Sequence, residues 1–143
     1  MKNKFFLVPL LSVLFFLPNI SLAQNKIFSN NSNVVIHVNN NNKRTFKMAL
    51  AYTRALKNKY LDKISITIVT DGPGVGMVNS QNKYKNQVES LLKKGVKINA
   101  CNTTIKKLLK VKKLPIIEGV KIVPNGVVEV FELQRKGYYY LRP

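Results

Sequence analysis

The sequence predicts one α/β domain, a three-layer α/β/α sandwich around a mostly parallel sheet of about five strands. Short runs of β-branched residues alternate along the chain with segments whose apolar residues recur at helical spacing. Strands separated by single helices form βαβ units, which require parallel pairing and right-handed crossovers. The strands also carry few polar residues on either face, which is typical of a sheet covered by helices on both sides.

Residues 1–23 have the pattern of a cleaved signal peptide. Two lysines precede the apolar segment FFLVPLLSVLFFL, and small residues lie just before the expected cleavage point after Ala23. The apolar segment is shorter than the roughly 20 residues of a membrane-spanning helix, so we expect cleavage rather than an uncleaved anchor. The sequence thus predicts a periplasmic or secreted protein without stable membrane insertion, with a flexible lead-in at 24–33 and a domain at 34–143.

The first half of the domain is predicted as strand, helix and strand. Residues 34–38 (VVIHV) form a β-branched run that ends at four asparagines, which favours a strand entering a turn. Residues 43–60 place their apolar side chains on one side of a helix. Residues 64–69 (ISITIV) form a second strand, ended by the strong turn sequence Asp71-Gly72-Pro73-Gly74.

The second half continues the alternation. A helix is predicted from Tyr84 to Leu92, with Gly95 as its terminating glycine. Residues 96–101 form the third strand, and Asn102 is expected to cap a helix that carries Ile105, Leu108 and Leu109 on one face. The remaining predicted elements are a loop at 114–119, a strand at 120–123, a helix at 127–136 and a short strand at 138–141.

The segment 127–136 is ambiguous because VVEVFEL also alternates like a strand. Asn125 and Gly137 bracket it as suitable helix caps, which favours a helix.

The net charge of +18 comes mostly from lysine, and loss of the two signal lysines lowers it by two. Such a charge raises the question of a nucleic acid or an anionic membrane as partner. The lysines are not interleaved with aromatic residues, however, and asparagine is nearly as common as lysine. We therefore expect a solvated basic surface and no nucleic-acid partner, although the cluster from Lys106 to Lys113 is a candidate basic patch.

Ligands of an open parallel sheet bind beyond the carboxyl ends of the strands. That rule selects the stretches after four predicted strands, which contain every reactive group apart from lysines and scattered acids. The candidate residues beside Cys101 are His37, Asn39, Gly72, Pro73, Gly74, Asn102, Thr103 and Asn125.

Cys101 is the only cysteine, which excludes an internal disulfide. At the start of a helix, free backbone N–H groups and the helix dipole would lower the pKa of its thiol. Lys106 and Lys107 would add to this effect, and no acidic residue lies within ten positions of Cys101. The alternative is a small buried side chain that ends a strand.

His37 is a candidate base or proton shuttle if it points into the same crevice, and otherwise a packed residue with a satisfied ring. No metal-ligand spacing is present, so no metal is expected. The loop after the second strand lacks the third glycine of a dinucleotide fingerprint, since Met77 and Asn79 stand there, so no cofactor is expected. Its backbone amides are instead expected to be exposed and able to bind an anion.

Four segments together resemble the DsrE/DsrF-like family, in particular its exported branch with a GPGV turn. They are IHVNNNNKRTFKMALAYTRAL, ITIVTDGPGVGMV, YKNQVESLLKKGVKINACNTTI and VKIVPNGVVEVFELQRKGYYYLRP. The resemblance implies a DsrEFH-like (Rossmann-like) fold that assembles into trimers or hexamers. In sulfur-relay members a cysteine after the third strand accepts and passes on persulfide sulfur, and Cys101 stands at the matching place.

The leading functional hypothesis is therefore an exported sulfur carrier, or sulfurtransferase-like protein, that uses Cys101 with donor and acceptor proteins as partners. Whether it turns over as an enzyme is left open. The alternative is a non-catalytic oligomeric binding module for a small anion or an acidic partner, and a third is an oligomeric scaffold without a ligand.

Overall fold

The computed structural model describes residues 32–109 and 114–143. The predicted signal peptide and most of the lead-in lie outside the described residues. The lead-in prediction was wrong for its last two residues, because strand β1 (Ser32–Val38) already begins at Ser32, which pairs with Ile64. Among the residues described, no helix is long and apolar enough to cross a membrane.

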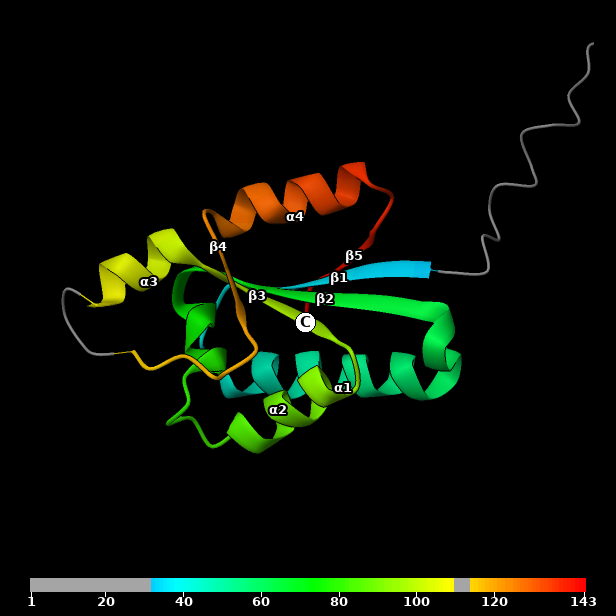
Figure 1. Cartoon of the computed structure of the whole chain (residues 1–143), viewed down its shortest axis with the longest axis horizontal. Coiled ribbons are helices and arrows are strands. Elements are labelled where there is room, and N and C mark those ends of the chain that lie inside the picture. The colour runs from blue at the N-terminus through cyan, green and yellow to red at the C-terminus, as the bar shows by residue number, and fades with distance from the viewer. Residues whose placement is uncertain (1–31, 110–113) are drawn as a thin grey trace, which may run out of the picture.

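The sheet is five-stranded and parallel, with the strand order β4-β3-β2-β1-β5. The strands after β1 are β2 (Ile64–Thr70), β3 (Lys97–Cys101), β4 (Lys121–Val123) and β5 (Tyr139–Leu141). Helices α1 (Lys43–Tyr60) and α2 (Lys85–Lys93) cover one face of the sheet, and α4 (Gly126–Arg135) covers the other (Figure 1). This arrangement confirms the predicted α/β sandwich.

The remaining helices lie between strands. Helix α3 (Asn102–Leu109) follows β3 without a loop, and two 3₁₀ helices, η2 (Leu61–Lys63) and η3 (Gly72–Val78), flank β2. On the predicted apolar face of α3, Ile105 is buried and Leu108 is 37% exposed. Helix α3 packs mainly against η3 and the end of β3, so one turn of it meets the core. The side chain of Leu109 lies outside the described residues.

The ambiguous segment is a helix, as predicted. The side chain of Asn125 accepts hydrogen bonds from the backbone N–H groups of Val127 and Val128 at the start of α4. Gly137 has a φ of +83°, and its N–H bonds to the carbonyl oxygen of Gln134 beyond the last turn. Both ends are thus closed by local bonds that a strand would not use.

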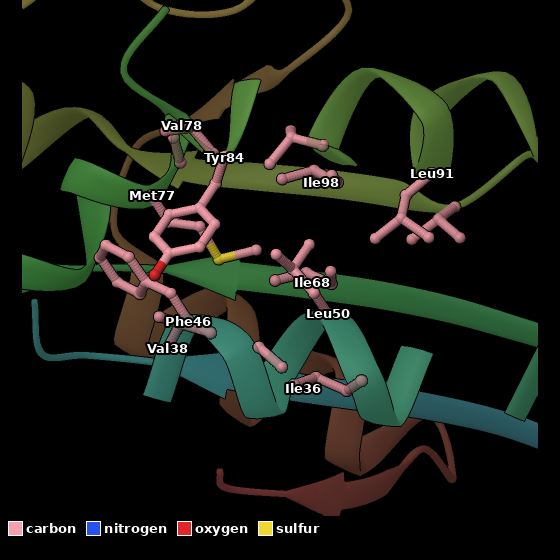
Figure 2. Packing of buried hydrophobic residues seen from close by; sticks show 14 of the residues in the cluster. Ile36, Val38, Phe46, Leu50, Ile68, Met77, Val78, Tyr84, Leu91 and Ile98 are labelled. Carbon is pink, nitrogen blue, oxygen red and sulfur yellow. The ribbon is translucent and has the colours of Figure 1, made fainter. Parts of the chain in front are cut away.

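The two faces of the sheet differ in polarity. The face under α1 and α2 carries the larger core, in which side chains such as Ile36, Leu50 and Ile68 pack together (Figure 2). The face under α4 has only a small apolar cluster, and it carries the buried polar residues Thr67 and Asn99. The expectation of few polar residues on either face therefore holds for one side only. The α4 side is where polar chemistry is concentrated.

Candidate thiol site

The carboxyl ends of β1, β2 and β3 meet the start of α4 at one edge of the sheet. Three side chains lie there: His37 from β1, Asp71 directly after β2, and Cys101 at the end of β3. Gly126, the first residue of α4, lies against both Asp71 and Cys101. Four segments that are distant in sequence therefore form one site.

Cys101 caps helix α3. The helix begins at Asn102, so the cap is Cys101 itself and the expected capping role of Asn102 was wrong. The backbone N–H groups of Thr103 and Thr104, the second and third residues of the helix, lower the pKa of the Cys101 thiol by hydrogen bonding. These are the groups that a serine or aspartate cap would bond. The thiol thus takes the place of a capping oxygen.

Two further donors reach the same sulfur. They are the hydroxyl of Thr104 and the backbone N–H of Gly126 at the start of α4. The sulfur therefore lies at the N-termini of two helices, both of which favour negative charge.

These bonds outweigh the effect of burial on the thiol. Burial by itself raises the pKa of Cys101, but the hydrogen bonds from Thr104, Gly126 and Thr103 together lower it below the ordinary value of 9.0. Lys106 and Lys107 are not among the groups that shift this pKa, and both are exposed on α3. The expected pKa shift is therefore present, with hydrogen bonds rather than lysines as its cause.

Cys101 is also buried, with 4% of its surface exposed, and it belongs to the larger core cluster. The sequence left open whether the thiol is buried or activated, and the structure shows both properties together. The sulfur faces backbone amides, yet very little of it reaches solvent.

An acid lies close to the thiol in space. A methyl group at Gly126 would be 2.7 Å from Cβ of Asp71 and 3.2 Å from Cβ of Cys101, so both side chains touch the same glycine. Asp71 is 7% exposed. No acid lies within ten positions of Cys101 along the chain, as noted from the sequence, but the fold brings Asp71 near because β2 and β3 end side by side. Asp71 is not among the groups that shift the pKa of Cys101.

The ring of His37 lies between Asp71 and Tyr140. Its Nε2 atom is 3.1 Å from Oδ1 of Asp71, and its Nδ1 atom is 3.0 Å from the hydroxyl of Tyr140. The contact to Asp71 is close but not aligned as a hydrogen bond. The ring is therefore packed and held by its neighbours, and its contact in the site is with the acid rather than with the thiol.

The turn after β2 is a buried 3₁₀ helix. The N–H of Gly72 donates to Oγ1 of Thr104 at 3.0 Å, and the N–H of Gly74 donates to the carbonyl oxygen of Asp71 at 2.9 Å. The expectation of exposed amides able to bind an anion was therefore wrong for both glycines. The bond from Gly72 instead holds the hydroxyl of Thr104, the side chain that lowers the pKa of Cys101.

The other candidate residues hold the surrounding loops. Oδ1 of Asn39 is 3.5 Å from Nη2 of Arg142, and the Thr103 hydroxyl donates to the carbonyl oxygen of Pro124 at 3.0 Å. The side chain of Asn125 is occupied in capping α4. Pro73 is exposed in η3 and Asn102 is half-buried at the start of α3.

Comparison with known proteins identifies the family. The DsrE/DsrF-like family model matches residues 32–143, which is most of the sequence. The chain belongs to the DsrE/DsrF-like family. No protein with curated annotation matches it.

Solved structures share this DsrE-like fold. MTH1491 from Methanobacterium thermoautotrophicum, described as a protein of unknown function, is 26% identical with a TM-score of 0.72, covering 79% of this chain and 100% of its own. BT1422 from Bacteroides thetaiotaomicron, likewise of unknown function, is 20% identical with a TM-score of 0.62, covering 78% and 95%. The ychN protein from E. coli is 18% identical with a TM-score of 0.65, covering 78% and 99%.

Sequence reasoning missed four members of this DsrE-like site: Asp71, Thr104, Gly126 and Tyr140. Thr104 had a signal, because the third residue of a helix normally bonds to the cap. Asp71 and Gly126 stood within the strand-end stretches that the sequence selected together with Cys101, but neither was named as a site residue. Tyr140 is in β5, which becomes a neighbour of β1 only when the sheet forms. Among the residues that the structure describes, no group of three or more His, Cys, Asp or Glu could hold a metal ion.

Proposed function

We propose that this DsrE-like protein carries sulfane sulfur as a persulfide on Cys101. The thiolate attacks the outer sulfur of a donor persulfide, R–S–SH. A new S–S bond forms on Cys101, the donor's S–S bond breaks, and its thiolate leaves and is protonated by water. Transfer to an acceptor thiolate repeats the exchange and restores the Cys101 thiolate. Sulfur moves with no net change of oxidation state, so no other oxidant or reductant is needed.

The observation that supports this proposal is the set of donors around the sulfur. A thiolate is the nucleophile in such an exchange, and donors that lower the pKa of Cys101 raise the thiolate population near neutral pH. The family is generally linked to sulfur relay, which makes sulfur the favoured cargo. The same donors would hold the terminal anion of a persulfide.

Burial of the thiol gives the proposal a second requirement. With 4% of Cys101 exposed, a donor reaches the sulfur only after a local opening around it. The first turn of α3 is one of the two helix starts next to the sulfur, the other being Gly126 of α4. We propose that this turn shifts while sulfur is loaded onto Cys101, and that Asp71 stays in place at the end of β2.

Export, assembly into oligomers and partner proteins are part of the same proposal. The signal-like N-terminus supports export, and the resemblance supports a homo-oligomer of three or six copies that meets donor and acceptor proteins. Sequencing the N-terminus of exported protein tests the first point, with Gln24 as the expected first residue. Light scattering of the purified protein tests the second.

Intact-mass measurement after incubation with an inorganic polysulfide tests the carrier proposal. The expected result is a gain of one sulfur atom, removed by a reducing agent and absent in Cys101→Ser. The Ser variant is a matched control because serine also caps helices well. Failure of folded wild-type protein to gain sulfur, at a pH where its thiol reacts with iodoacetamide, would overturn the proposal.

A further inference from the structure

A groove separate from the thiol site lies on the α4 side of the sheet, toward the other end of α4. It is a groove of about 660 Å³ between the C-terminal half of α4 and the β3–β4 edge. Parallel register places Thr67 beside Lys97 and Asn99 beside Lys121, all on the face that α4 covers. The groove thus has a polar floor built from three adjacent strands.

One buried polar side chain of this groove, Thr67, has no polar partner among the described residues. Thr67 is 1% exposed, and within the described part of the chain its hydroxyl has no hydrogen-bond partner. A buried hydroxyl without a partner is costly, and a bound ligand is one way to satisfy it. Thr67 is among the residues that line the groove.

The charge of the groove is positive. Lys97, Lys121 and Lys136 line it, and none of the three is in an ion pair with a described residue. Its one carboxylate, Glu129, accepts a hydrogen bond from Nδ2 of Asn99 at 2.8 Å. Three lysines and one carboxylate give the groove an excess of positive charge, which favours binding of an anion.

Apolar side chains complete the walls. Leu92, Val96, Leu133 and Tyr138 also line the groove. A groove of this size with apolar walls and a few polar groups suits an organic molecule better than a bare inorganic ion.

We propose that this groove binds a small organic anion, with its charged group near the lysines and the Thr67 hydroxyl and its apolar body against the walls. The site is separate from Cys101 and does not depend on sulfur transfer. A sulfonate, a carboxylate and a phosphate ester share this chemistry, and competition between them identifies the preferred group.

Fluorescence titration with anilinonaphthalenesulfonate, an apolar anion, tests the site. The double variant Lys97→Gln/Lys121→Gln should bind roughly tenfold more weakly, because two nearby charges are lost. The control Lys47→Gln/Lys59→Gln removes the same charge from exposed positions on α1, across the sheet, and should change binding less than about twofold. Equal weakening by both pairs, or no weakening by either, would overturn the proposal.

Thr67→Val separates a ligand contact from a structural role. Removing the unpartnered hydroxyl should raise the melting temperature of the free protein, yet weaken binding of the dye roughly fivefold. Unchanged binding would refute the role of Thr67.

Competition with the dye tests the apolar walls. Phenyl phosphate should displace the dye at a lower concentration than inorganic phosphate, and benzoate at a lower concentration than acetate. Equal displacement within each pair would refute the role of the apolar walls. Cys101→Ser should bind the dye as wild type does.

Discussion

Alanine substitution at three glycines tests the close packing around the thiol. A methyl group at Gly126 would lie 2.7 Å from Cβ of Asp71 and 3.2 Å from Cβ of Cys101. At Gly74 it would lie 2.0 Å from the carbonyl oxygen of Val38. At Gly76 the nearest atom is Cζ of Phe46, at 3.9 Å. The three sites therefore differ in available space, and none of the three has a positive φ.

These distances set the expected order of destabilisation. Carbon atoms in contact are ordinarily separated by about 3.5–4.0 Å, so Gly126→Ala forces α4 away from the sheet. Overpacking of this kind costs about 1–3 kcal/mol. Gly74→Ala meets a backbone carbonyl that cannot rotate aside, so it should cost more than Gly126→Ala. Gly76→Ala should change the free energy of unfolding by less than about 1 kcal/mol.

Thermal unfolding followed by circular dichroism measures the order. For a domain of this size, 1 kcal/mol corresponds to about 4 °C, so Gly126→Ala should lower the melting temperature by about 4–12 °C. The same variant moves the Gly126 N–H away from the sulfur, which should raise the pKa of Cys101 and slow its alkylation near neutral pH. A Gly126→Ala protein as stable as Gly76→Ala would refute this packing around the thiol.

Three further predictions concern the hydrogen bonds of the site. Thr104→Val removes the hydroxyl donor to Cys101, so the pKa of the thiol should rise and iodoacetamide should react with it more slowly at neutral pH. Thr103→Val is the control, because it removes a hydroxyl that bonds elsewhere and keeps the backbone donor. Equal alkylation rates in the two variants would contradict the role of the Thr104 hydroxyl. The pKa of Cys101 is lower in the folded state than in the unfolded state, so its contribution to stability is fully present above the unfolded pKa and is lost as pH falls through the folded pKa. In urea unfolding, the free energy of unfolding of wild type minus that of Cys101→Ser should therefore increase from neutral pH to above pH 9.0. A difference that does not change with pH would argue against a stabilised thiolate. Tyr140→Phe removes the 3.0 Å contact to His37 at a partly exposed position, so it should lower the free energy of unfolding by less than about 1.5 kcal/mol. Alkylation of Cys101 should be unchanged, and a changed rate would show that the His37 ring is coupled to the thiol.

Local pattern accounts for the parts of the fold that were predicted. Helix α1 has the predicted bounds, and each strand was located within two residues. Helix α4 was identified despite its alternating sequence, because the caps at Asn125 and Gly137 are local signals. The position of Cys101 at a helix start was also predicted, since it depends on adjacent residues.

Long-range contacts account for the parts that were missed. Asp71 was not among the predicted site residues, yet Asp71 and Cys101 both touch Gly126. The amides of Gly72 and Gly74 were expected to be free, but folding uses them to hold Thr104 and to close the turn. The groove near Thr67 has no sequence signature, because its residues come from separate strands and helices.

The sequence by itself determined the order of strands and helices, the parallel sheet and the place of the lone cysteine before a helix. These features follow from periodicity and capping, which act between residues close together in the chain. Only the tertiary structure decided that the starts of two helices lie at the thiol, that Asp71 and Cys101 contact the same glycine, and that solvent is largely excluded from the thiol. Those properties depend on which strand ends become neighbours, and that is settled when the sheet assembles.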